Sequence, residues 1–403
     1  MSKTIWYVSK YASPAKYGFA SRHFYFCKEF QKKGINTVII TSDSNHTASV
    51  PLFDDNYQHE TIDGIKTIWC KCIRYNGTFS IKRILSWLQF EFRLLKLKDK
   101  ILPRPDAIIV SSLSLFTILN GIRLKRKYKC KLVFEIRDIW PLTLTSFGHF
   151  SNSNPVINFL GWVEKAGYRK SDLIIGTMPN LEEHVQKQIG EVDKCFSIPQ
   201  GVDLELFSNP EPLSREYISK YIPKNKIIVC YAGSIGITNA LDTLLEVATS
   251  MQNIEIHFLF VGNGDLKEKY IKEYNSYSNI TFAPRIKKEQ VQSLLKECDI
   301  LYDSVNKSKL YDYGLSRNKW IDYMYSEKPI IASFSGFKSM VNEANCGVFV
   351  EAENQEMLHQ AINEMADLNK EERDKIGKKG RAWLLKYRTF DILADRYLKI
   401  IDL

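Results

Sequence analysis

Short apolar runs rich in β-branched residues alternate with amphipathic helical stretches along the whole 403-residue chain. This alternation constrains the fold more than any other feature of the sequence. A strand, a helix and a second strand in succession form a βαβ unit, which places both strands parallel in one sheet. We therefore expect an α/β protein whose ligands bind beyond the carboxyl ends of parallel strands.

The predicted strands fall into two series separated by a loop. The first series covers residues 4–10, 36–42, 65–71, 106–112, 131–137 and 173–179, and the second covers 226–234, 254–264, 280–285, 298–305, 328–334 and 346–352. Proline, glycine and polar residues gather near 200–215 and mark a boundary. We expect one domain over residues 1–205, a second over 206–385, and a terminal helix over 386–403 that packs back toward the first domain.

Charge and cysteine content narrow the classes of partner and compartment. The chain has 56 basic and 46 acidic residues, and the surplus suits an anionic partner such as a nucleotide, a phosphate-bearing lipid or an acidic membrane. No aromatic and basic recognition motif accompanies this charge, so we do not expect a nucleic-acid partner. The eight cysteines match neither a zinc site nor a disulfide scaffold, and we interpret them as reduced core thiols of a cytosolic protein.

Any membrane contact is expected to be peripheral. No stretch reaches the roughly 18 uninterrupted apolar residues of a membrane span, and the apolar run at residues 5–8 is typical of a strand rather than a signal peptide. Residues 80–100 form a basic amphipathic pattern, and residues 123–131 add a second basic block. Such a helix could lie on an anionic membrane, or it could face the core with a solvated basic back. Its basic residues are Lys82, Arg83, Arg93, Lys96, Lys98 and Lys100.

Glycine-containing loops occur at three strand or helix boundaries of the second series. Gly233 and Gly236 follow one strand, Gly262 and Gly264 follow the next, and Gly314 precedes an amphipathic run. Glycine lets backbone amides approach an anion, and a helix N-terminus attracts negative charge. The loops match neither the P-loop nor the dinucleotide fingerprint. They indicate an anion site, with purely steric turns as the alternative.

Lys319 and Asp322 stand three residues apart in the run that follows Gly314. On a helix they share one face. The lysine could pair with a diphosphate, and the acid could accept hydrogen bonds from ribose hydroxyls. The alternative is a solvated ion pair between the two, which stabilises a helix by only a few tenths of a kcal/mol.

Several segments of the chain, in the same order as in the family, resemble the family 4 glycosyltransferases. The segments PQGVDLELF, YAGSIGITNALDTLLEVA, FLFVGNGDLKEKY and SRNKWIDYMYSEKPIIAS are similar to the donor-binding half of that family, and YGFASRHFYFCKEFQKKGINTVIITS and FEIRDIWPLTL to the acceptor half. The resemblance implies the GT-B fold, in which two Rossmann-like domains face each other across a cleft. It is greatest to bacterial sugar transferases of O-antigen and capsule synthesis, including the N-acetylfucosamine transferase type.

The resemblance implies roles for the residues around Gly314. Asp322 matches the second acid of the family motif and is expected to bind ribose. The first acid would fall at Gly314, so we expect the amides of Gly314, Leu315 and Ser316 to face the sugar or the phosphates. Lys319 then becomes the main source of positive charge for the diphosphate.

Other donor contacts follow from the same resemblance. Ser234 and Asn239 stand where many members have an arginine and a lysine, so the phosphate site has less fixed charge. The loop at Arg285 and Ile286 is expected to contact the base through its backbone; the alternative is that Arg285 is an ordinary surface arginine. The expected donor contacts beyond those named above are completed by Gly18, Gly236 and Asn318.

The acceptor half departs from the family at the strand 131–137. Arg137, followed by Asp138, stands where many members have a histidine. Arginine is not a base at ordinary pH, so it would bind a phosphate or a sugar hydroxyl, or orient Asp138. The alternative is a buried pair of Arg137 with Glu135 or Asp138. Arg22 is expected either to meet an acceptor phosphate or to carry surface charge.

The implied activity is retaining transfer of a sugar from a nucleotide sugar, with uridine as the expected base, to a lipid-linked or oligosaccharide acceptor of surface polysaccharide synthesis. Arg137, Asp138 and Lys319 are the catalytic candidates. Fixed donors at the leaving phosphate are the main source of rate enhancement, and Lys319 with the loop amides at 234–236 and 314–316 would supply them. We expect no metal or cofactor, closure of the two domains during the reaction, and a cytoplasmic protein at the inner face of the cell membrane. The alternative is a non-catalytic protein that binds sugar nucleotides or acts as a scaffold at the membrane.

Overall fold

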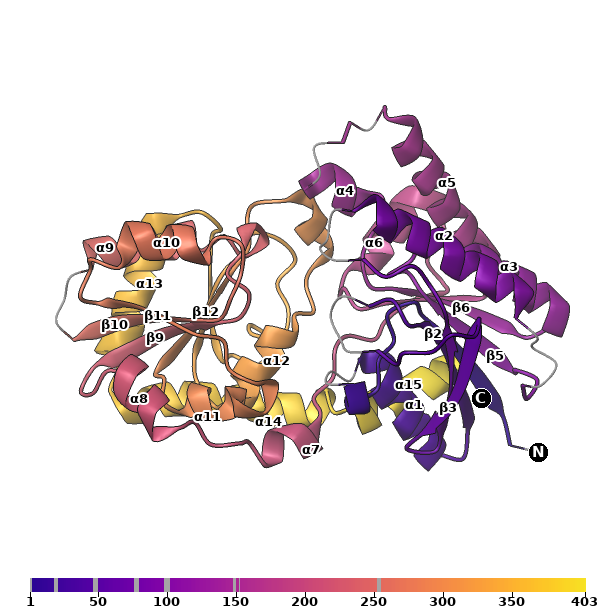
Figure 1. Ribbon diagram of the computed structural model, residues 1–403. Helices are drawn as coiled ribbons and strands as arrows, with labels where there is room; N and C mark the ends of the chain where they lie inside the picture. The colour runs from indigo at the N-terminus through magenta and orange to yellow at the C-terminus, as the bar shows by residue number, and fades with distance from the viewer. Residues whose placement is uncertain are drawn as a thin grey trace. The chain divides into compact units, whose positions relative to one another are not determined.

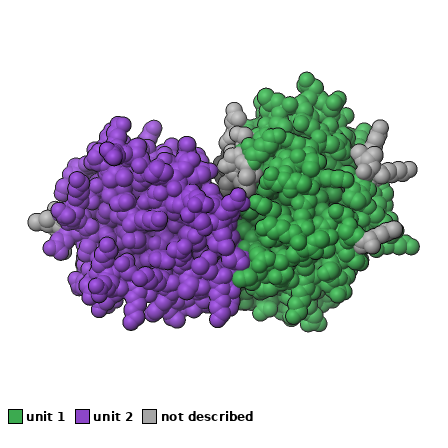
Figure 2. All heavy atoms as spheres, turned by 90° about the horizontal axis from the view of Figure 1, so that it is seen from below, with its two compact units in different colours: residues 1–199, 390–403 green, residues 200–389 purple. Residues whose placement is uncertain are grey.

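The computed structural model describes residues 2–17, 21–45, 50–75, 80–97, 102–147, 150–151, 153–251 and 255–403. The chain forms two compact units, one of Met1–Pro199 with Phe390–Leu403 and one of Gln200–Thr389 (Figure 2). Each unit contains a largely parallel sheet covered by helices (Figure 1). The predicted two-domain α/β fold with parallel sheets is confirmed.

The sheet of the first unit runs in the order β3-β4-β2-β1-β5-β6-β7-β8. Its strands are β1 (Thr4–Val8), β2 (Asn36–Ser42), β3 (Tyr57–Ile62), β4 (Ile65–Cys70), β5 (Ala107–Ser111), β6 (Lys131–Ile136), β7 (Leu173–Gly176) and β8 (Cys195–Ser197). Only β3 pairs antiparallel among these described strands. The sequence pattern missed β3 and β8, because β3 is a polar, partly exposed edge strand and β8 has three residues.

Helices cover both faces of this sheet. On one face, α1 (Arg22–Lys32) packs against the terminal α15 (Phe390–Ile401), where the ring of Phe26 lies 5.4 Å from Phe390 and 5.2 Å from Tyr397. On the other face, α3 (Thr117–Tyr128) lies between α2 (Ile81–Lys96) and α5 (Pro155–Lys170) (Figure 1). The unit also contains α4 (Leu142–Phe147) and α6 (Leu181–Ile189).

Arg22 lies in the core of the first unit rather than at its surface. Its side chain and that of Glu135 are fully buried, with the guanidinium Nη2 3.0 Å from the carboxylate Oε1. The same guanidinium donates to the carbonyl oxygens of Pro199 and Ile198, each at 2.9 Å. Tyr7 also donates to Glu135, at 2.7 Å. The structure therefore supports neither an acceptor phosphate contact nor a surface role for Arg22.

The second unit contains a six-stranded sheet in the order β11-β10-β9-β12-β13-β14, with every described pair parallel. Its strands are β9 (Ile227–Ala232), β10 (Ile256–Val261), β11 (Ile280–Ala283), β12 (Ile300–Ser304), β13 (Ile330–Ser333) and β14 (Gly347–Val350). Its helices are α7 (Leu204–Ser208), α8 (Arg215–Tyr221), α9 (Asp242–Ser250), α10 (Lys267–Tyr274), α11 (Val291–Lys296), α12 (Asn318–Tyr325), α13 (Gln355–Asp367) and α14 (Lys370–Tyr387). All six predicted strands of the second series are present.

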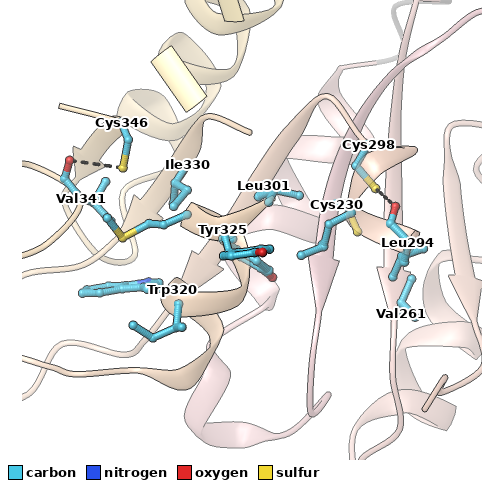
Figure 3. Close-up of a cluster of buried hydrophobic side chains, with 14 of the residues drawn as sticks. Cys230, Val261, Leu294, Cys298, Leu301, Trp320, Tyr325, Ile330, Val341 and Cys346 are labelled. Carbon is cyan, nitrogen blue, oxygen red and sulfur yellow. Dashed lines mark hydrogen bonds between the residues drawn. The ribbon is translucent and has the colours of Figure 1, made fainter. Parts of the chain in front are cut away.

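The cysteines are part of the core. All eight are unpaired, and all but one are buried. Figure 3 shows Cys230, Cys298 and Cys346 among the apolar side chains that join the second sheet to α11, α12 and α14. The thiol of Cys298 donates to the carbonyl of Leu294 at 3.3 Å, and that of Cys346 to Val341 at 3.6 Å. The prediction of free core thiols is confirmed.

The buried ion pair of the first unit predicts a large loss of stability for Arg22→Met. This change leaves the Glu135 carboxylate buried without its cationic partner, and such losses cost about 3–5 kcal/mol. Thermal unfolding, with amide exchange on β6 to identify the unit that melts, measures the effect. Arg126→Met, at an exposed site in the last turn of α3, is the control. Equal stability of the two variants would contradict the ion pair.

Candidate functional site

A pocket of about 420 Å³ lies at the carboxyl edge of the second sheet. Its walls come from the loops after β9, β10 and β11 and from α12. Four of the predicted donor contacts, Ser234, Arg285, Ile286 and Asp322, line it together. The order of the sheet explains this, because β9, β10 and β11 are neighbours whose carboxyl ends meet at one edge.

Gly262 and Gly264 bring two loops into backbone contact. A Cβ atom on Gly262 would lie 1.8 Å from the carbonyl oxygen of Gly233, and one on Gly264 would lie 2.0 Å from that of Ile235. The Ile235 amide donates to the Asn263 carbonyl across the same junction, at 3.0 Å. The steric alternative therefore explains these two glycines. Any side chain there would separate the β9 and β10 loops that form the pocket wall.

A buried carboxylate holds two cations beside this pocket. Asp303, at the end of β12, lies 2.9 Å from the Lys319 ammonium through Oδ1 and 3.0 Å from the Arg317 Nε through Oδ2. Arg317 also donates to the Asn239 amide oxygen at 2.6 Å. The alternative of an ion pair between Lys319 and Asp322 is wrong, because each of these residues has a partner from another βα unit.

Lys319 lies beneath the loop that follows β9. Its ammonium donates to the Tyr231 hydroxyl at 2.8 Å, and a Cβ atom on Gly233 would meet the ammonium at 3.0 Å. Burial lowers the pKa of Lys319 to about 8, while Asp303 opposes this shift. The lysine is therefore mainly protonated at neutral pH and close to titration. Gly233, which lines the pocket, lies next to this ammonium.

Asp322 binds Lys288, which the sequence pattern did not single out. The ammonium of Lys288 lies 2.5 Å and 2.7 Å from the two carboxylate oxygens. Burial raises the pKa of Asp322 above its usual value, and Lys288 opposes that rise. Both residues line the pocket, on the same side as the base loop at Arg285. The pair places one carboxylate and one ammonium within reach of a ligand with hydroxyl groups.

The turn before α12 differs from expectation. Gly314 has φ +80°, a left-handed conformation that favours glycine, and its amide donates to the Tyr311 carbonyl at 2.9 Å. That amide already has a backbone acceptor, and its expected contact with the sugar or the phosphates stays a prediction. The Ser316 hydroxyl accepts from the Gln200 amide at 2.8 Å, while Leu315 is half-buried and Asn318 is exposed at the first position of α12.

Arg137 and Asp138 follow β6 of the first unit. Their amides donate to the Ser112 hydroxyl at 2.9 and 3.4 Å, which fixes the start of the loop. Within the described residues the Arg137 guanidinium has neither a hydrogen bond nor an ion pair, and Asp138 is exposed. Glu135 pairs with Arg22, so the alternative of a Glu135–Arg137 pair is wrong. Gly18 lies outside the described residues.

Removal of the Asp303 carboxylate should change the pKa of Lys319 by a measurable amount. Asp303→Asn should lower the pKa of Lys319 below about 8, because Asp303 is the largest contributor that keeps it charged. It should also cost about 3–5 kcal/mol of stability, since two buried cations lose their counterion. NMR of labelled lysine side chains gives the pKa, with the exposed Asp367→Asn on α13 as control. An unchanged or higher pKa would contradict the arrangement.

Two family models match the chain. Residues 18–206 match the family described as "Glycosyltransferase Family 4", and residues 215–383 match "Glycosyl transferases group 1". A search of curated proteins found no significant match.

Solved structures share the fold across the whole chain. Sucrose-phosphate synthase from Thermosynechococcus elongatus has 17% identity and a TM-score of 0.76, covering 99% of this chain and 98% of that one. Anabaena HepE in complex with UDP has 13% identity and a TM-score of 0.65, covering 100% of both chains. WaaG, described as a glycosyltransferase involved in lipopolysaccharide biosynthesis, has 14% identity and a TM-score of 0.66, covering 98% and 99%. The chain therefore carries a glycosyltransferase family 4 domain followed by a glycosyl transferases group 1 domain, in a GT-B fold.

Proposed function

We propose that the protein transfers a sugar from a uridine diphosphate sugar to a lipid-linked or oligosaccharide acceptor, with retention of anomeric configuration. The observation that carries the donor site is the pocket that unites Asp322, Lys288 and the Arg285 loop, next to the buried Lys319. The complex of HepE with UDP supports uridine as the base.

The proposed donor lies along the edge of the second sheet. Its base contacts the backbone at Arg285 and Ile286, and its ribose hydroxyls donate to Asp322. Lys288 already neutralises that carboxylate, so ribose binding shares or displaces its ammonium. The diphosphate then meets the loop after β9 and the N-terminus of α12, where backbone amides and the positive end of the helix favour an anion.

Leaving-group stabilisation is assigned to two cations. When the bond between the anomeric carbon and the diphosphate breaks, negative charge grows on the leaving phosphate. Lys319 and Arg317 are held by Asp303 and therefore need little reorganisation to meet that charge. In the proposed retaining path the leaving phosphate accepts the proton of the acceptor hydroxyl, and the mechanism uses no metal. The guanidinium of Arg137, which has no ion pair or hydrogen bond among the described residues, is assigned to a phosphate or sugar hydroxyl of a ligand on the first unit.

Removal of the Lys319 charge tests this assignment. Lys319→Met should lower kcat about 100-fold or more, since loss of one preorganised donor to a developing charge has that effect. Asp322→Asn should mainly raise the donor KM, because ribose binding is shared by ground state and transition state. Release of UDP from a panel of UDP-sugars, with and without acceptor, measures both variants.

Lys269→Met, at an exposed position of α10, is the control for the loss of one lysine. Full activity of both test variants would contradict the donor site. A protein that binds UDP but turns over no donor with any acceptor or with water would favour the alternative, a non-catalytic nucleotide-binding or scaffold protein.

Membrane contact is proposed through α2. Its apolar residues Ile81, Ile84, Leu85, Leu88, Phe92 and Leu95 are 45–78% exposed, and the helix is instead anchored by Ser86, Phe90 and Leu94. The core-facing alternative is therefore wrong. Lys82 and Lys96 flank the apolar face as exposed cations, whereas Lys98 and Lys100 lie outside the described residues. In the described part of the chain, no helix has the length and apolar character needed to cross a membrane.

An apolar face flanked by lysines fits the surface of an anionic bilayer. Two stacked aromatic residues of α5, Phe159 and Trp162, are also 51% and 59% exposed. This surface supports a role at the inner face of the cell membrane, where a lipid-linked acceptor of O-antigen or capsule synthesis would be met. The description of WaaG is consistent with such a role.

Charged substitutions on α2 test the membrane contact. The double change Leu88→Glu with Phe92→Glu should abolish co-sedimentation with vesicles of phosphatidylcholine and phosphatidylglycerol, because it places two anions on the apolar face. Activity toward a water-soluble acceptor should persist. Leu385→Glu, at a similarly exposed leucine of α14, is the control. Unchanged vesicle binding by the double variant would exclude α2 as the contact.

A further inference from the structure

A second pocket, of about 390 Å³, lies in the second unit between α7, α11, α14 and the turn after α12. It shares no lining residue with the donor pocket. Helix α12 lines the donor pocket with Asp322 and Tyr323, whereas this second pocket is lined by Tyr325, the last residue of α12, and by Ser326, which follows it. The two pockets are therefore distinct sites.

The walls of this pocket carry a concentrated positive charge. Five cations line it against two acids, Glu327 and Asp374. Arg381 is paired with Glu327 at 3.0 Å, but in the described part of the chain the four lysines have neither an ion pair nor a hydrogen bond. These lysines are Lys296, Lys328, Lys370 and Lys378. Like charges gathered around one cavity raise its potential and attract an anion.

Helix dipoles explain only part of this charge. Lys296 is in the last turn of α11, and Lys328 follows the end of α12, so both lie near the negative end of a helix. Lys370 is the first residue of α14 and lies at the positive end, where a cation is unfavourable. One face of α14 lines the pocket, because the lining residues of this helix are three or four positions apart: Lys370, Asp374, Lys378 and Arg381. A ligand that requires cations would account for that face.

The floor of the pocket is aromatic and held in place. The rings of Phe207 and Tyr325 lie 5.0 Å apart, and the Tyr325 hydroxyl is 3.3 Å from that of Ser208. The Arg381 guanidinium lies over the Tyr325 ring at 4.5 Å. A Cβ atom on Gly377 would come within 2.0 Å of the Glu327 carbonyl, so the turn and α14 are in backbone contact. The basic groups therefore surround a preformed cavity with hydroxyl donors in it.

We propose that this pocket binds a multiply charged, phosphate-bearing ligand at a site separate from the donor. Phosphate oxygens form charge-assisted hydrogen bonds with lysine and arginine, and they also accept from the hydroxyls of Ser208 and Tyr325. The phosphate belongs either to a soluble compound or to a lipid headgroup. The proposal does not depend on the donor function, because no residue of the donor pocket takes part.

The test is a calorimetric titration of the full chain with pyrophosphate while UDP occupies the donor pocket. The pair Lys370→Gln with Lys378→Gln removes two pocket cations. The pair Lys375→Gln with Lys379→Gln removes two exposed cations from the same helix that do not line the pocket. The wild type and the control pair should bind pyrophosphate, and the pocket pair should bind at least about tenfold more weakly. If UDP does not bind, which would count against the donor function, the titration without UDP still tests this pocket.

A second arm distinguishes the source of the phosphate. On a Phe92→Glu background, the two pairs are compared for co-sedimentation with phosphatidylcholine and phosphatidylglycerol vesicles. A loss confined to the pocket pair assigns the site to a lipid headgroup, while a loss of pyrophosphate affinity alone assigns it to a soluble phosphate compound. Equal pyrophosphate affinity and equal vesicle binding of the two pairs would overturn the proposal.

Discussion

The buried carboxylate of Asp303 is the interaction on which the functional edge of the second unit depends. It lies at the end of β12 and is 1% exposed by its side chain, yet it is satisfied through both oxygens by Lys319 and Arg317. Without it, two cations next to the sheet edge would repel each other in a site of low polarity. With it, Lys319 and Arg317 are fixed in position. Two cations share one carboxylate, so a net positive charge remains to stabilise a leaving phosphate.

The same edge depends on backbone packing that glycine allows. The β9 and β10 loops touch at Gly262 and Gly264, and Gly233 lies directly above the Lys319 ammonium. A side chain at any of these positions would move either a loop or the lysine. The sequence pattern predicts that these glycines expose their amides to an anion. Gly262 and Gly264 instead let the β9 and β10 loops touch, and this contact positions the pocket wall next to the Lys319 ammonium.

The strands could be predicted because buried parallel strands are continuous apolar runs. The partners of the charged residues could not, because they come from different βα units and the order of strands in the sheet brings them together. Lys319 and Asp322 are close in sequence, but Asp303 and Lys288 are their partners in space. Arg22 belongs to an amphipathic helix, and its pattern predicts either an acceptor phosphate contact or surface charge, whereas the acid that holds it lies inside an otherwise apolar strand.

The net charge of +10 has different physical meanings in different parts of the chain. Arg22 is neutralised by the buried Glu135, and Lys319 shares the buried Asp303 with Arg317, so these cations act mainly on groups in direct contact. Exposed cations such as Lys370 and Lys378, which have no ion pair within the described part of the chain, attract anions over about one Debye length, 8–10 Å. The anionic partner inferred from composition is therefore expected to bind the exposed cations rather than the buried ones. The buried cations provide chemistry once a ligand has arrived, and the structure is needed to tell the two apart.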